Sequence, residues 1–243
     1  MRIKAANFIK KKNTIEWRSN EPSRLETFSD AVFAFAVTLI IVSLEVPKSF
    51  TELFETMKGT VSFAACFALL FLIWNNQNLF FRRYGLNDSW TVTLNGILLF
   101  VVLVFAYPLK FLFGLLFSFS DQTYMLNGHI QPVISNIQTP TLMLIYGAGY
   151  TVIYLLFFLM YTNAKKHKAE LKLTTIELYE TTTEAYVNLI CVVIGVSAML
   201  LALLLPLAYS GMSGFIYFII PLAYFFCYGY RGRQSRRKFG SQS

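Results

Sequence analysis

The sequence predicts an all-α membrane protein with six membrane-spanning helices and with both termini in the cytoplasm. The chain of 243 residues is 56% hydrophobic and 17% aromatic but only 14% charged, a balance that water-soluble domains rarely have. The apolar residues fall in long runs of about 17 to 28 residues, enough to cross about 30 Å of hydrocarbon. Lys and Arg gather in alternate gaps between these runs, which is the positive-inside pattern. We therefore expect one helical membrane domain.

The first predicted span covers residues 24–46 and has a well-marked start. Ser23 followed three residues later by Glu26 has the form of a capping box, which satisfies the free backbone amides of a helix start. Pro22 just before it stops any earlier helix from running through. The apolar run that follows ends at Glu45-Val46-Pro47.

The later spans are placed by apolar length and by flanking charge. Arg82-Arg83 ends the second span on the cytoplasmic side, and the segment 118–140, which has no Lys or Arg, fits the outer side. Lys165-Lys166 follows the fourth span, and a basic cluster that starts at Arg231 closes the chain. The predicted spans are 60–81, 88–117, 141–161, 185–209 and 214–230.

The two ends of the chain are polar and basic. Residues 1–22 are expected to form a cytoplasmic N-terminal segment, either a short helix at the membrane interface or a mobile tail. Residues 23–230 form the predicted spanning domain, and residues 231–243 form a basic cytoplasmic tail. The net charge of +8 does not indicate nucleic-acid binding, because the basic residues lie in short clusters between apolar runs.

Catalytic chemistry has no support in the sequence. The three cysteines, Cys66, Cys191 and Cys227, lie inside apolar runs and are typical of small core residues. No sequence pattern of a nucleophile, a phosphate-binding loop or a metal site is present. We therefore expect a protein that is not an enzyme and that needs no cofactor.

The first span carries charges that are unusual at membrane depth. Arg24 and Asp30 lie within or beside it, and such groups usually face a protein interior or a water-filled path. Two interpretations stay open: they hold neighbouring helices together, or they lie beside an ion path.

One face of the same helix is apolar with a single hydroxyl group. At about 100° per residue the face contains Ala31, Phe35, Thr38, Val42 and Glu45, and Leu39 flanks it. This face either lines a narrow pore that ends in a carboxylate or is an ordinary packing face.

The second span contains the polar run Trp74-Asn75-Asn76-Gln77-Asn78. Amides in an apolar helix need partners, because lipid offers none. Asn95 in the third span is expected at a similar depth. The run therefore predicts either a buried amide network that joins the first three spans or an ion or proton relay.

A glycine-rich stretch in the fourth span, Gly147-Ala148-Gly149-Tyr150, has some likeness to a potassium filter. A carbonyl filter needs a re-entrant loop at the outer side, whereas this stretch lies in the middle of a predicted helix. Small residues at such a position permit close helix packing, which is the interpretation we adopt.

Arg24, Phe28, Ser29 and Asp30, followed by an apolar helix that ends in Glu-Val-Pro, resemble the first-helix signature of the transmembrane-protein-175 family. This family comprises lysosomal potassium channels and their bacterial relatives. Trp74 matches its second-span Trp, and Asp88 and Asn95 match its third-span pair. Gln77 stands where the family has a histidine, so the titratable group is missing there. The resemblance implies that these eight residues brace the pore helix, with Arg24 and Asp30 also involved in gating.

The resemblance further implies a homotetramer in the cell membrane, a bacterial inner membrane, that passes potassium selectively or preferentially. Four copies of the first span would surround the pore. Phe35 would occupy the narrow apolar constriction, where the family usually has Leu or Ile, and Leu39 matches a second constriction position. The hydroxyl of Thr38 would transiently bind permeant potassium, while Val42 would form a further ring. Glu45 at the outer mouth would concentrate cations or act as an interfacial charge.

A small secondary transporter of cations is the alternative function. It would need a midplane site formed by broken helices or an inverted repeat. Neither feature is evident in the sequence, apart from Pro108 and Pro206 in the predicted helices.

Overall fold

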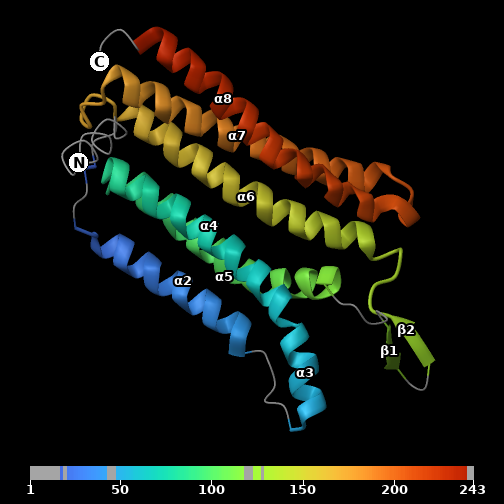
Figure 1. The fold of residues 1–243 in the computed structure, drawn as a ribbon. Helices are drawn as coiled ribbons and strands as arrows, with labels where there is room; N and C mark the ends of the chain where they lie inside the picture. The colour runs from blue at the N-terminus through green and yellow to red at the C-terminus, as the bar shows by residue number, and fades with distance from the viewer. Residues whose placement is uncertain (1–16, 19–20, 43–47, 118–122, 127–128, 240–243) are drawn as a thin grey trace, which may run out of the picture.

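The computed structural model describes residues 17–18, 21–42, 48–117, 123–126 and 129–239, which form a bundle of long helices lying side by side (Figure 1). The described part of the chain begins and ends at the same end of the bundle (Figure 1). The elements are α2 (Arg24–Val42), α3 (Phe50–Lys58), α4 (Thr60–Tyr84), α5 (Ser89–Phe117), β1 (Thr123–Leu126), β2 (His129–Pro132), α6 (Thr139–Lys166), α7 (Thr175–Leu204), the 3-10 helix η1 (Leu207–Phe218) and α8 (Ile219–Phe239).

Five helical segments of the described chain are long and apolar enough to cross a membrane, namely α4, α5, α6, α7 and the η1–α8 unit. The sixth long helix, α2, has 19 residues, which reach about 28 Å at 1.5 Å per residue. Its first two turns carry Arg24, Glu26 and Asp30. The predicted all-α membrane fold is confirmed.

Three local features differ from the prediction. The segment after α2, expected to be a loop, contains α3, whose apolar residues recur at helical spacing as Phe50, Leu53, Phe54 and Met57. The outer loop between α5 and α6 contains an antiparallel hairpin in which β1 pairs with β2. The last span begins with the 12-residue η1, and α8 continues beyond residue 230 to Phe239. None of these features changes the number of long helices.

The start of α2 is the capping box that the sequence predicts. The backbone N–H of Ser23 donates to Glu26 Oε1 over 2.9 Å, and the N–H of Glu26 donates to Ser23 Oγ over 3.2 Å. Thr174 and Glu177 form the same reciprocal pair at the start of α7. Both helices therefore begin at a residue that the local sequence fixes.

Close packing around α6 depends on its glycines. A Cβ atom at Gly149 would lie 2.0 Å from Phe105 Cε1 of α5, and one at Gly147 would lie 2.5 Å from Met199 Cγ of α7. The expectation that this stretch serves helix packing is confirmed. Because α6 touches both α5 and α7, it joins the first half of the bundle to the second.

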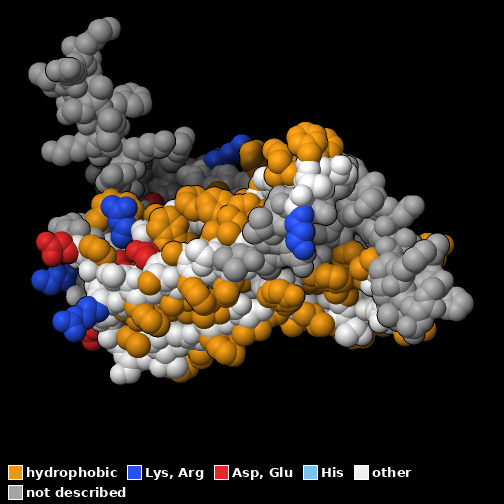
Figure 2. Space-filling view, turned by 90° about the horizontal axis from the view of Figure 1, so that it is seen from below, with side chains coloured by type: hydrophobic (Ala, Val, Ile, Leu, Met, Phe, Trp, Pro, Cys, Tyr) orange, Lys and Arg blue, Asp and Glu red, His pale blue; other side chains and the backbone are white. Residues whose placement is uncertain are grey.

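The surface has the distribution of a membrane protein. Figure 2 shows hydrophobic side chains along the length of the face seen from below Figure 1, with charged side chains gathered mainly at the end where both termini lie. Exposed aromatic and aliphatic residues along α5, α7 and α8 extend this apolar surface around the bundle. A surface of this kind requires lipid or another protein chain around it.

Candidate functional site

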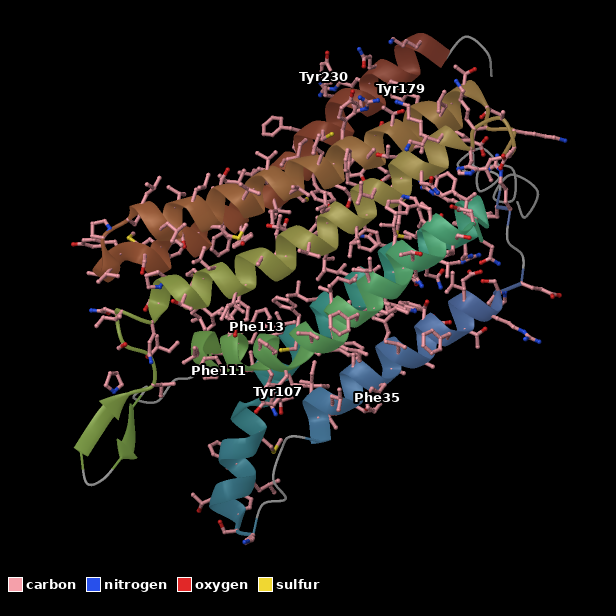
Figure 3. The ribbon with its side chains drawn as sticks, turned by 180° about the vertical axis from the view of Figure 1, so that it is seen from behind. Phe35, Tyr107, Phe111, Phe113, Tyr179 and Tyr230 are labelled. Carbon is pink, nitrogen blue, oxygen red and sulfur yellow. The ribbon has the colours of Figure 1, made fainter. Side chains whose placement is uncertain are left out.

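Helix α2 has one buried face and one exposed face. Ala36 and Ile40, which are 0% and 2% exposed, lie on the side packed against α4 and α5. On the opposite side Ala31 and Thr38 are exposed, and 56% of Phe35 is exposed. The described residues of the face that the sequence identifies as pore or packing surface are therefore exposed on the surface of the subunit (Figure 3).

The hydroxyl group of Thr38 has a defined orientation. Its Oγ1 donates a hydrogen bond of 2.7 Å to the backbone carbonyl of Phe35, one turn earlier on the helix. Since this bond uses the only proton of the hydroxyl, the remaining lone pairs can only accept. An exposed group that offers acceptor lone pairs suits contact with a cation or with the hydrogen atoms of water.

The structure describes some of the other predicted residues of this helix but not all of them. Leu39 and Phe28 are exposed on the flank of the same face, and Arg24 is exposed at the helix start. The side chain of Val42 and the whole of Glu45 lie outside the described residues.

A fully buried chain of polar side chains connects α2, α5 and α4. Ser29 Oγ donates to the carbonyl of Leu25 over 2.8 Å and accepts from Asn95 Nδ2 over 2.9 Å. Asn95 Oδ1 in turn accepts from Gln77 Nε2 over 3.1 Å. At most 1% of each of these three polar side chains is exposed. The structure thus joins Ser29, Gln77 and Asn95, which the sequence singled out from three separate helices.

A second link between α2 and α4 lies nearer the surface. The indole Nε1 of Trp74 donates to Asp30 Oδ1 over 2.6 Å. Beside this pair a groove of about 390 Å³ runs between the two helices. The groove is lined by Asp30, Phe33, Ala34, Val37, Phe67, Leu70, Phe71 and Trp74.

Asp88 joins the start of α5 to α6. Its Oδ1 accepts from Thr91 Oγ1 over 2.6 Å, and its Oδ2 accepts from Asn163 Nδ2 over 3.1 Å. Burial of the carboxyl raises its pKa, but the hydrogen bonds from Thr91 and Asn163 and the proximity of His167 lower it, and the net pKa lies below the usual value. Asn163, which completes this cluster, was missed at the sequence level; its only signal is an amide near the end of an apolar run.

Trp17 and Arg18, which precede α2, contact other helices of the bundle, although no motif in the sequence singled them out. The Arg18 guanidinium contacts the Glu177 carboxylate of α7 with two hydrogen bonds of 3.0 Å each. The Trp17 ring lies under the guanidinium of Arg82, 4.5 Å from the ring centroid. A Trp-Arg pair ahead of the first span was the available signal, but a partner so far along the chain could not be inferred from it.

Comparison with known proteins gives a consistent match to one family. The sequence profile of the family described as endosomal/lysosomal potassium channel TMEM175 matches residues 24–106. A protein of Marivirga tractuosa named potassium channel is 37% identical over 217 residues, which cover 85% of this chain and 86% of that protein. A potassium channel of Chamaesiphon minutus is 29% identical over 97 residues, which cover 37% of this chain and 48% of that protein.

A solved structure extends the likeness to nearly the whole chain. The crystal structure of a variant of the potassium channel MtTMEM175, in complex with a Nanobody-MBP fusion protein, has a TM-score of 0.76 and 35% sequence identity. The match covers 93% of this chain and 98% of the other. Both halves of the helical bundle are therefore shared.

Proposed function

The chain belongs to the endosomal/lysosomal potassium channel TMEM175 family, and on that premise we propose that it forms a potassium-selective or potassium-preferring cation channel. The names of the relatives support this activity, and the multi-pass helical fold suits it. We place the channel in the cell membrane, the inner membrane of a bacterium. Its activity needs no catalytic group and no cofactor other than the permeant ion.

The proposed channel is a homotetramer in which four copies of α2 surround a central pore. The observation that carries this proposal is the exposed face of α2, which lies opposite Ala36 and Ile40. Of the described residues of this face, Ala31, Phe35 and Thr38, only Thr38 is polar, and its hydroxyl proton is used in the bond to the carbonyl of Phe35. Lipid gives such an acceptor no partner, whereas a hydrated or partly dehydrated cation does.

Each residue of this face has a proposed role. Four copies of Phe35 would form an apolar constriction that closes by losing water, and Leu39 would form a second narrow ring. Four hydroxyl groups of Thr38 would replace part of the water shell of potassium. Val42 and Glu45 would continue the pore towards its outer mouth, where the Glu45 carboxylate would concentrate cations.

The remaining motif residues would fix the rotation of α2 about its own helix axis. The buried chain from Ser29 through Asn95 to Gln77 supports this role, because turning α2 would break it. Trp74 and Asp30 would hold the same helix from the side of α4. Arg24 and Phe28 would act at the helix start, and Asp88 would act through the α5–α6 contact. Residues 23–230 would form the channel domain, between cytoplasmic segments 1–22 and 231–243.

Electrical recording from the purified protein in planar lipid bilayers tests the function. We expect unitary current steps under a potassium gradient, with a reversal potential close to that for potassium when sodium is present on the other side. A flux that shows no unitary steps and that saturates with a fixed ion stoichiometry would instead identify a secondary transporter.

A further inference from the structure

The chain just before α2 is fastened at several points to the end of the bundle where the termini lie. The backbone N–H of Arg18 donates to the carbonyl of Arg82 over 3.1 Å. Its guanidinium donates to the carbonyl of Leu171 over 2.9 Å and to the carbonyl of Arg83 over 3.3 Å. The same guanidinium holds both carboxylate oxygens of Glu177 over 3.0 Å each. Arg18 therefore joins the segment that precedes α2 to the end of α4, to the α6–α7 turn and to α7.

The ion pair is largely removed from water. The side chain of Glu177 is 3% exposed and that of Arg18 is 16% exposed. A planar guanidinium that donates two parallel bonds to a carboxylate fixes direction as well as distance, which a lysine cannot do. The pair is therefore a rigid attachment.

The attachment lies close to α2 along the chain. Helix α2 begins at Arg24, six residues after Arg18, and its capping box is set by Ser23 and Glu26. A segment of six residues spans at most about 21 Å when fully extended. The N-terminal end of α2 can therefore lie only a short distance from the attached residue, Arg18.

The direction of the attachment follows from the order of the helices. In Figure 1, α7 lies on the far side of α4, α5 and α6 from α2. The exposed face of α2 lies opposite Ala36 and Ile40, which face α4 and α5. The link from Arg18 to α7 therefore holds the N-terminal end of α2 against its own subunit. In a tetramer assembled on the exposed face, that direction is away from the shared axis.

We propose that Arg18 is a positioning residue that, through Glu177, holds the cytoplasmic ends of the four pore helices apart and so maintains the open probability of the channel. The proposal rests on the proposed function. Without the pair, the ends of α2 can converge on the axis and close the entrance for a larger fraction of the time. While the channel is open, its lining is unaltered, because the substitutions leave the proposed pore residues Phe35 and Thr38 in place.

Two neutral variants in the full-length channel test the proposal in planar bilayers. Arg18→Gln removes the cation, and Glu177→Gln removes the anion while Gln still serves the capping box with Thr174. We expect each to lower the single-channel open probability by at least about fivefold. Unitary conductance and reversal potential should equal those of the wild type. The double variant should be no lower than Arg18→Gln alone, because Arg18→Gln already removes the pair with Glu177 together with the bonds to Leu171 and Arg83.

Matched controls separate gating from general damage. Lys165→Gln removes an exposed basic residue at the same end of the bundle and should leave the open probability unchanged. Arg18→Lys keeps the charge but not the double hydrogen bond, and should give an intermediate value if Arg18→Gln does not assemble. Size-exclusion chromatography and thermal unfolding report assembly and stability for every variant.

The outcomes are distinguishable. Wild-type open probability in Arg18→Gln and Glu177→Gln, or an additive loss in the double variant, would overturn the inference. So would variants that lose only thermal stability and otherwise gate as the wild type. If the wild-type protein gives no unitary potassium currents, the proposed function fails first and this inference fails with it.

Discussion

Asn95 on α5 donates its side-chain amide to the hydroxyl of Ser29 on α2 over 2.9 Å, and both side chains are fully buried. Through Gln77 the same Asn95 also reaches α4. In an apolar bundle such a chain has one arrangement in which every member is satisfied, so it specifies the rotation of α2 as well as its position.

Replacing Asn95 should destabilise the protein measurably. Asn95→Ala leaves Gln77 and Ser29 buried without their shared partner, at an expected cost of about 1–3 kcal/mol in the free energy of unfolding. Thermal unfolding of the purified protein in detergent measures this as a lower Tm. Asn75→Ala, in a half-buried amide of the same polar run, is the control and should change Tm far less. Equal shifts for the two variants would contradict a special role for the buried chain.

Thr38 should control the preference for potassium. Thr38→Ala removes the outward lone pairs, and we expect the potassium-over-sodium permeability ratio to fall about fivefold, which corresponds to about 1 kcal/mol. Reversal potentials under bi-ionic conditions measure the ratio. Thr38→Ser keeps the hydroxyl and should keep most of the preference. An unchanged ratio in Thr38→Ala would remove Thr38 from the selectivity mechanism.

Phe35 should limit the current. Phe35→Ala would widen an apolar constriction and allow more water into it, so unitary conductance should rise about twofold or more. Phe100→Ala provides the comparison, because Phe100 is an exposed aromatic residue on α5 and not on α2. A conductance that responds equally to both substitutions would place Phe35 away from the ion path.

Asp88 should make stability depend on pH in a defined direction. Because its pKa in the folded protein is lowered from 3.8, its charged form stabilises the fold above that value, and this contribution disappears as pH falls through the lower folded pKa. Asp88→Ala should cost about 1 kcal/mol at pH 7 through loss of a cap at the start of α5. Tm measured between pH 7 and pH 3 should show the difference from wild type shrinking in acid. A difference that stays constant over this range would contradict the lowered pKa.

Several parts of the candidate site follow from the sequence for local reasons. The start of α2 follows from Ser23 and Glu26, because a capping box acts within four residues. The opposite faces of α2 follow from the helical period, which separates Phe35 and Thr38 from Ile40 without any knowledge of neighbours. The short helix α3 escaped prediction because nine residues give a weak periodic signal.

Partners across helices did not follow from the sequence. The polar residues Gln77 and Asn95 were expected to need partners, but only packing brings both to Ser29. Asp88 was grouped with them by its likeness to a family motif, and the structure instead places it with Thr91 and Asn163. Helical period fixes the face on which a residue lies, whereas depth and neighbour depend on how whole helices stack.

The sequence by itself determined the class of this protein, the number of its long helices and the start of the first one. Those properties depend on apolar length, on the distribution of Lys and Arg and on hydrogen bonds within one turn, all of which act locally. Only the tertiary structure decided that Arg18 reaches Glu177, 159 positions along the chain. Such a pair forms because folding brings α7 beside the end of α4. No pattern in the sequence around Arg18 or around Glu177 indicates that the two residues are partners.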